Sequence, residues 1–355
     1  MQTIQANGYE IYFNENGYEI LNKHLNEYNY SSIFILVDSN TNEKCLLRFL
    51  SFLATEKNIE IIEIEAGESE KNITTCVEIW SILTDLGADR KSVLINLGGG
   101  VITDIGGFVA STFKRGVDFI NIPTSLLAMV DASIGGKNGV DLGNLKNQIG
   151  VISVPKLVLV DTDYLNTLPQ NEMRSGLAEM LKHGLIADAA YWSAFKDLSK
   201  TDFADFDGLV HRSIEIKNNI VLQDPTENGI RKALNFGHTL GHAIESYCLE
   251  NEDKKTLLHG EAIAIGMIME SFISWQTNLL SETDYNEIKE VITSIFDRVF
   301  FDENDLQPII DLLIHDKKNE YGKIQFALLD GIGAIKINQK ADNDLITKSF
   351  LDYNS

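Results

Sequence analysis

The 355-residue sequence has few cysteines, a shortage of positive charge and no long hydrophobic run. Its 3 cysteines, Cys45, Cys76 and Cys248, form no C-x-x-C pair. Disulfides and cysteine-ligated metals are therefore not expected, and a reducing, cytoplasmic compartment fits best. The chain carries 30 lysines and arginines against 52 aspartates and glutamates, a net charge of −22. This balance argues against nucleic acid or an anionic membrane as the main partner, but it does not exclude an anionic small molecule.

Signals for export and membrane insertion are also missing from the sequence. The start, MQTIQANGYEIYF, has no basic region followed by an apolar run, so we expect no signal peptide. The most apolar stretch, residues 262–275, contains Glu270 and is too short to cross a bilayer. Repeats and low-complexity linkers are absent as well. We expect a soluble protein of two tightly packed domains or one large domain.

The first half of the sequence alternates short apolar runs with amphipathic segments, a pattern that predicts a mostly parallel sheet covered by helices. Residues 71–86 have apolar positions at helical spacing. The buried strands that we expect are residues 32–38, 59–64, 93–97, 119–123 and 157–161.

After Asp161 the pattern becomes mainly helical. The helices that we expect are residues 171–185, 207–222, 238–249, 260–275 and 284–299, followed by a β-hairpin within 322–337. The predicted fold class is therefore α/β, with a Rossmann-like domain at 1–161 and a mainly helical domain at 162–355. We expect the site in the cleft between them.

A glycine-rich stretch, residues 98–107, follows an expected strand and opens an expected helix. Glycines there let backbone N–H groups approach a pyrophosphate at a helix N-terminus. The spacing is not the usual G-x-G-x-x-G, so a tight, closely packed turn explains it too. Asp38, at the end of an earlier strand, could bind a ribose hydroxyl or cap a turn. These features suggest NAD without establishing it.

Three histidines and one glutamate are candidate metal ligands. His238 and His242 are four residues apart and share a helix face, which suits zinc. His259 precedes an apolar helical segment, and Glu179 interrupts another. A buried carboxylate needs a partner, which a metal can supply. Histidines at such positions also serve as packing or capping residues, and the spacing alone does not show which of them bind.

Several cations lie beside glycines or apolar segments. Lys137, flanked by glycines and preceded by Asp131, is typical of a lysine that reaches a phosphate. Any one of these cations could instead be a solvated surface charge, so the argument depends on the whole set. The other members are Arg115, Lys146, Lys182, Lys217, Arg231, Lys317 and Lys318.

Taken together, the motifs closely resemble the 3-dehydroquinate synthases, a family of sugar phosphate cyclases. The matching blocks cover nearly the whole chain in the family's order, and their combination is far more specific than any one of them. They are GESEK (67–71), GGGVITDIGGF (98–108), RGV (115–117), PTSLLAMVDASIGGKNGV (123–140), KNQIG (146–150), LPQNEMRSGLAEMLKHG (168–184), NFGHTLGHAIE (235–245), HGEAIAIGM (259–267) and HDKK (315–318).

The resemblance implies roles for individual residues. It implies zinc ligation by Glu179, His238 and His259, with His242 contacting substrate instead. Arg115 resembles a residue that reaches into the neighbouring subunit's site, so we expect a homodimer. The implied NAD contacts are Asp38, Asn40, Glu68, Lys71, Gly100, Val101, Asp104, Thr124, Ser125, Asp131, Lys137, Lys146 and Thr167. The implied substrate-binding and catalytic residues are Lys137, Lys146, Asn147, Lys182, Lys217, Arg231, Asn235, His242 and one of the pair Lys317 and Lys318.

The reaction implied by the resemblance converts 3-deoxy-arabino-heptulosonate 7-phosphate into 3-dehydroquinate and phosphate. NAD takes a hydride and returns it, phosphate is eliminated between these steps, and an intramolecular aldol reaction closes the ring. Zinc and cobalt are not distinguished by ligand type. Some positions depart from the family's pattern and put loop geometry in question; they are Asn138, Asp141, Leu145 and Pro225.

Other interpretations of the motifs are a different sugar phosphate cyclase, a metal-dependent polyol or alcohol dehydrogenase, and a non-catalytic relative. A dehydrogenase would release NADH and would not be expected to carry the whole set of lysines. A binding-only relative has no chemical need for intact ligands and cations.

Overall fold

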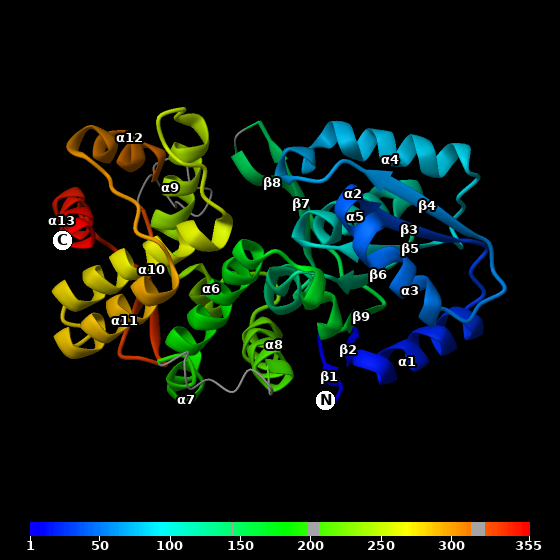
Figure 1. Cartoon of the computed structure of the whole chain (residues 1–355), viewed down its shortest axis with the longest axis horizontal. Helices are drawn as coiled ribbons and strands as arrows, with labels where there is room; N and C mark the ends of the chain where they lie inside the picture. Colours follow the sequence, from blue (N-terminus) through cyan, green and yellow to red (C-terminus); the bar gives the residue numbers. More distant parts are fainter. Residues whose placement is uncertain (144, 197–205, 314–323) are drawn as a thin grey trace. The chain divides into compact units, whose positions relative to one another are not determined.

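The computed structural model (Figure 1) describes residues 1–143, 145–196, 206–313 and 324–355. These residues form two compact units, Met1–Met173 and Arg174–Ser355. The division falls within a helix, α6 (Gln170–Ala187), whereas the domain boundary expected from the sequence was residue 161.

A seven-stranded sheet organises the first unit, in the order β1-β2-β9-β6-β5-β3-β4. β1 pairs antiparallel with β2, and the following pairs are parallel, which confirms the mostly parallel sheet. The central strands β3, β5 and β6 are mainly apolar and almost wholly buried because helices cover both faces of such a sheet. The strands are β1 (Ile4–Gln5), β2 (Glu10–Phe13), β3 (Ile33–Asp38), β4 (Ile59–Ile64), β5 (Val93–Gly98), β6 (Asp118–Pro123) and β9 (Leu157–Val160).

Helices pack against this sheet and close its core. Leu36 and Leu94 of the sheet are buried in one cluster with Ile79 and Ile105 of two helices. Burial of each such side chain stabilises the fold by about 1.5–3 kcal/mol. The helices of this unit are α1 (Asn14–Glu27), α2 (Ser39–Thr41), α3 (Leu47–Phe52), α4 (Ile73–Asp85) and α5 (Gly100–Thr112).

A separate antiparallel hairpin, β7 (Lys137–Leu142) and β8 (Leu145–Ile152), was not expected from the sequence. Its glycines bring the two backbones together, since a Cβ on Gly139 would lie 2.7 Å from the Ile149 carbonyl oxygen. The hairpin carries Lys137, Lys146 and Asn147 of the predicted site.

The second unit is mainly helical, as expected. α10 (His259–Gln276) is its buried centre and packs against α9 (His238–Glu250), α11 (Glu282–Ile295) and α13 (Asn343–Asn354). The other elements are α7 (Ala189–Ser193), α8 (Phe206–Gln223), α12 (Glu303–Leu313) and the antiparallel pair β10 (Phe326–Leu329) and β11 (Ile335–Gln339).

One expected helix end in the second unit was wrong. The helix expected to reach Val299 ends at Ile295, because Phe296 has an extended backbone with φ −113° and ψ 137°. α12 and α13 were not expected, while the hairpin predicted within 322–337 is present as β10 and β11. Across the described ranges, no helix has both the length and the apolar character that a membrane crossing requires.

Candidate active site

Glu179, His238 and His259 converge in the second unit from three different helices. The Glu179 side chain is fully buried on α6, and its Oε1 lies 3.5 Å from His238 Nε2 and 3.8 Å from His259 Nε2. Ligand atoms bound at about 2.1 Å to one tetrahedral zinc ion stand about 3.4 Å apart. Both distances from the Glu179 oxygen to the imidazole nitrogens are therefore close to the separation that a single zinc ion imposes.

The other ring nitrogens of these two histidines face acceptors. His238 Nδ1 lies 3.1 Å from the Phe236 carbonyl oxygen, and His259 Nδ1 lies 3.3 Å from Glu245 Oε2. A proton on Nδ1 that donates to such an oxygen leaves the Nε2 lone pair for a metal. Glu245 was missed by sequence reasoning, although it lies on the same helix as His238, in the block NFGHTLGHAIE.

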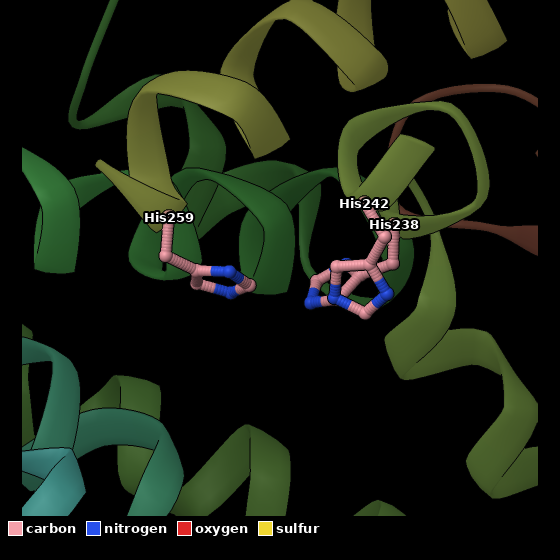
Figure 2. A group of neighbouring side chains, drawn as sticks. All are labelled: His238, His242 and His259. Carbon is pink, nitrogen blue, oxygen red and sulfur yellow. The ribbon is translucent and has the colours of Figure 1, made fainter. Parts of the chain in front are cut away.

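His242 belongs to the same cluster. Figure 2 shows the His259 ring directed toward the rings of His238 and His242. Ring centroids lie 5.2 Å apart for His238 and His242 and 5.7 Å apart for His242 and His259. One nitrogen from each of the three rings lies within 4.8 Å of the others, so a three-histidine ligand set is also geometrically feasible.

The environment of the carboxylate favours Glu179 as a ligand. Both of its oxygens are buried, and neither accepts a hydrogen bond from the described residues. Oε2 forms an ion pair with the buried ammonium group of Lys182. A buried carboxylate without hydrogen bonds is costly, and a metal ion would satisfy the oxygen that faces the histidines. One carboxylate and two imidazoles suit zinc or cobalt, so the residues fit the metal that the resemblance implies.

Three cations of the predicted substrate-binding set are buried in this unit. Lys182 is 1%, Lys217 5% and Arg231 2% exposed, an unusual degree of burial for these residue types. Arg231 Nη1 donates to the Pro225 carbonyl oxygen at 2.8 Å. Asn235 Nδ2 donates to Glu227 Oε1 at 3.0 Å. Lys317 and Lys318 lie outside the described residues.

The glycine loop lies in the first unit, between β5 and α5. A Cβ on Gly99 would lie 3.3 Å from Ser125 Oγ, and one on Gly100 would lie 3.5 Å from the Ala132 Cβ. The loop is therefore next to the segment that carries Thr124, Ser125 and Asp131 of the predicted NAD set. Gly99 is the N-cap of α5 and supplies no side-chain cap, a condition that suits an anion at this helix N-terminus.

Four more members of the predicted NAD set form ion pairs in the first unit. Lys71 Nζ lies 2.6 Å from Asp104 Oδ2, and Lys146 Nζ lies 2.7 Å from Glu68 Oε1. Burial works to lower the pKa of Lys71, but Asp104, Glu68 and Asp141 outweigh it and raise that pKa above its ordinary value. The lysine is thus held charged beside the glycine-loop helix.

The remaining predicted residues of this unit lie in different settings. The Asp38 side chain caps α2 by accepting from Thr41 N at 2.8 Å, so the capping role considered for it is present. Asn40 is exposed on the same helix, and Thr167 Oγ1 lies 3.7 Å from Cys45 Sγ. Arg115 is exposed in a turn, where its φ is 71°.

Asp141 organises the hairpin residues of the predicted substrate set. Its Oδ1 accepts from the backbone N–H of Asn147 at 2.6 Å, and its Oδ2 lies 3.7 Å from Lys146 Nζ. Asn147 has a φ of 50°, which the hydrogen bond to Asp141 helps to hold. Asp141 was noted in the sequence only as a departure from the family's pattern.

Gly107 on α5 makes room for Asn138, the residue after Lys137. A Cβ on Gly107 would lie 1.8 Å from Asn138 Oδ1, while the Asn138 amide donates to the Gly136 and Ser153 carbonyl oxygens. We expect Gly107→Ala to lower the free energy of unfolding by about 2 kcal/mol, because the buried amide must move and lose these bonds. Denaturant unfolding of the variant and the wild type measures this difference in the free energy of unfolding.

Gly100→Ala is the matched control in the same helix. Its added methyl group would meet only ordinary van der Waals contact, so its free energy of unfolding should stay near that of the wild type. Equal stability of the Gly107→Ala variant and the wild type would contradict the packing argument.

The fold is found in two groups of solved structures. 2-Deoxy-scyllo-inosose synthase, complexed with carbaglucose-6-phosphate, NAD+ and Co2+, is 24% identical with a TM-score of 0.87, covering 99% of this chain and 100% of that one. 2-Epi-5-epi-valiolone synthase from Streptomyces hygroscopicus, with NAD+ and Zn2+ bound, is also 24% identical with a TM-score of 0.87, covering 99% and 98%. A glycerol dehydrogenase from Schizosaccharomyces pombe is 12% identical with a TM-score of 0.65, covering 100% and 90%. The fold class is therefore the one that sugar phosphate cyclases share with these dehydrogenases.

Sequence comparison identifies the family within this class. The family model for the 3-dehydroquinate synthase N-terminal region matches residues 61–175, and that for its C-terminal region matches residues 176–319. The 3-dehydroquinate synthase of Parabacteroides distasonis is 41% identical over 331 residues, 93% of each chain. That of Campylobacter jejuni subsp. doylei is 37% identical over 332 residues, 91% of this chain and 93% of its own. The chain belongs to the 3-dehydroquinate synthase family, which confirms the resemblance seen in the motifs.

Proposed function

We propose that this chain converts 3-deoxy-arabino-heptulosonate 7-phosphate into 3-dehydroquinate and phosphate, using NAD and zinc. The observation that carries the proposal is the convergence of Glu179, His238 and His259 at separations suited to one zinc ion, in a member of this family. Cobalt would fit the same ligands.

Two bound groups would supply chemistry that side chains lack. Zinc held by Glu179, His238 Nε2 and His259 Nε2 would act as a Lewis acid on substrate oxygens, and NAD at the glycine loop would accept and return a hydride. NAD+ occurs with Co2+ or Zn2+ in the two solved cyclases of this fold.

The chain's own cations would bind and orient the substrate. Lys182, Lys217 and Arg231 are buried, so their charges are held in fixed positions and are less screened by solvent. Such cations would fix the phosphate and carboxylate groups of the substrate, with Asn235 and His242 orienting the ring hydroxyls. Lys137, Lys146 and Asn147 of the first unit would complete the set, along with one of Lys317 and Lys318.

The elimination step requires a proton acceptor. The C–H bond to be broken becomes acidic once the adjacent ring hydroxyl is a ketone, and its electron pair then expels phosphate. We assign the proton to the leaving phosphate itself, so no side chain serves as a dedicated strong base. The chain's task is to hold the phosphate next to that proton and to exclude water.

Removal of the metal tests the proposal. Treatment with a chelator is expected to abolish phosphate release from the heptulosonate phosphate, and added Zn2+ or Co2+ should restore it. The same addition should raise the thermal midpoint, because the ion binds only the folded ligand set. Full activity in chelated protein shown to be metal-free would contradict the metal-dependent function.

A further inference from the structure

The helix that carries His238 begins without a cap of its own. Gly237 is the N-cap residue of α9, with φ 77°, and supplies no side-chain hydrogen bond. A side chain at this position is excluded, because a Cβ on Gly237 would lie 2.6 Å from Met267 Cγ and 3.1 Å from the Ile263 carbonyl oxygen. The first N–H groups of α9 must therefore find acceptors on another element.

Glu270 of α10 supplies those acceptors. It is fully buried; its Oε2 accepts from Gly237 N at 2.7 Å and its Oε1 accepts from Leu240 N at 3.2 Å. The two donors lie on either side of His238 in the sequence, so both ends of the turn that carries this histidine are bonded to one carboxyl group. A carboxylate at a helix N-terminus is also favoured by the helix dipole.

Glu270 lies on the same helix as the other candidate histidine ligand. It follows His259 by about three helical turns, which places the two residues on the same face of α10. The helices also touch through backbone between these points, since a Cβ on Gly266 would lie 2.0 Å from the Gly237 carbonyl oxygen. α10 therefore presents His259 at its start and holds the start of α9 through Glu270.

We propose that Glu270 is a positioning residue for the metal centre, one that fixes the His238 ring relative to the His259 ring through the N-terminus of α9. The inference rests on the proposed function, because it assumes that these two histidines bind a metal. Glu270 acts through the backbone, because its two carboxylate oxygens accept hydrogen bonds from the N–H groups of Gly237 and Leu240.

The test is a titration of the Glu270→Gln variant with Co2+ in the absence of substrate. Visible absorption measures both the affinity for Co2+ and the spectrum of the bound ion. Glutamine keeps the shape but presents an NH2 group to one of the two backbone donors. We expect apparent Co2+ affinity to fall by about 10-fold or more, within the range for outer-shell partners, with a changed Co2+ spectrum that reports altered ligand geometry.

Ser274→Ala is the matched control. Ser274 is fully buried one turn beyond Glu270, donates to the Glu270 carbonyl oxygen at 2.7 Å and accepts from Leu329 N at 3.0 Å. The Ser274→Ala substitution removes buried hydrogen bonds on the same helix but none to α9. The variant should therefore have a lower thermal midpoint, with the affinity for Co2+ and the Co2+ spectrum unchanged. An equal loss of Co2+ affinity in both variants would overturn the positioning role.

The outcomes also separate this inference from the proposed function. Wild-type affinity and spectrum in Glu270→Gln would overturn the inference alone, whereas a wild-type protein that binds no Co2+ would overturn both. If the glutamine variant does not fold, Glu270→Asp decides, because it keeps the charge but shortens the reach to Gly237 and Leu240. Weaker Co2+ binding by the aspartate variant supports the inference, and unchanged binding overturns it.

Discussion

Replacing Glu179 with glutamine is expected to lower kcat by about 1,000-fold and to remove the tightly bound metal. Loss of an outer-shell partner already costs about 10–100-fold, so loss of a direct ligand should cost more. The amide would place either an NH2 group or a weaker oxygen donor opposite the two Nε2 atoms. Metal content after gel filtration and steady-state phosphate release measure the two effects.

The informative comparison for this variant is His242→Asn. If Glu179 is the third ligand, the asparagine variant keeps its metal and loses activity only through substrate contact. The opposite pattern, with metal retained in Glu179→Gln and lost in His242→Asn, would mean that the three-histidine set binds the ion. Circular dichroism should accompany both, because Glu179→Gln also leaves the Lys182 ammonium without its ion-pair partner.

Replacing Lys71 with methionine is expected to lower the free energy of unfolding by about 3 kcal/mol. The buried Lys71 pairs at 2.6 Å with Asp104, whose side chain is only 16% exposed, and removal of one partner leaves the other charge uncompensated. Glu68 would repel the remaining carboxylate. Denaturant unfolding of Lys71→Met, Asp104→Asn and the double variant forms the test, and the double variant should recover at least half of the loss.

The stability deficit of Lys71→Met should depend on pH. Burial raises the pKa of Asp104 and Lys71 opposes that rise, so the variant should raise this pKa further. When the pKa of a carboxyl group is higher in the folded state than in the unfolded state, the free energy of unfolding falls as the pH rises between these two pKa values. The deficit should therefore be smaller at about pH 5 than at about pH 8. A deficit that is the same at both, or absent, would contradict a buried charged pair.

Much of the first unit could be predicted because its central strands are mainly apolar runs. β3 and β5 are buried on both faces, and this burial is visible in their residues alone. The β7–β8 hairpin could not be predicted in this way. Its residues are glycine-rich and partly exposed, and its pairing depends on a close approach of two backbones, which no apolar periodicity reports.

The candidate site shows a similar division. The His238 and His242 pair was visible as a helical spacing, but Glu179, His238 and His259 lie far apart in the sequence. No local pattern links them, and only the packing of α6, α9 and α10 brings them together. The resemblance supplied that ligand set in advance. Glu245 and Glu270 were missed because their roles depend on which backbone or ring they face in the folded unit.

The central claim is that NAD is used catalytically in a phosphate elimination. Its most direct test is to mix zinc-loaded protein, a small amount of NAD and 3-deoxy-arabino-heptulosonate 7-phosphate, and to record phosphate and NADH together. We predict phosphate far in excess of the NAD present, no net NADH, and 3-dehydroquinate as the product. Steady accumulation of NADH without phosphate would contradict the claim and place the chain's activity with the dehydrogenases of the same fold.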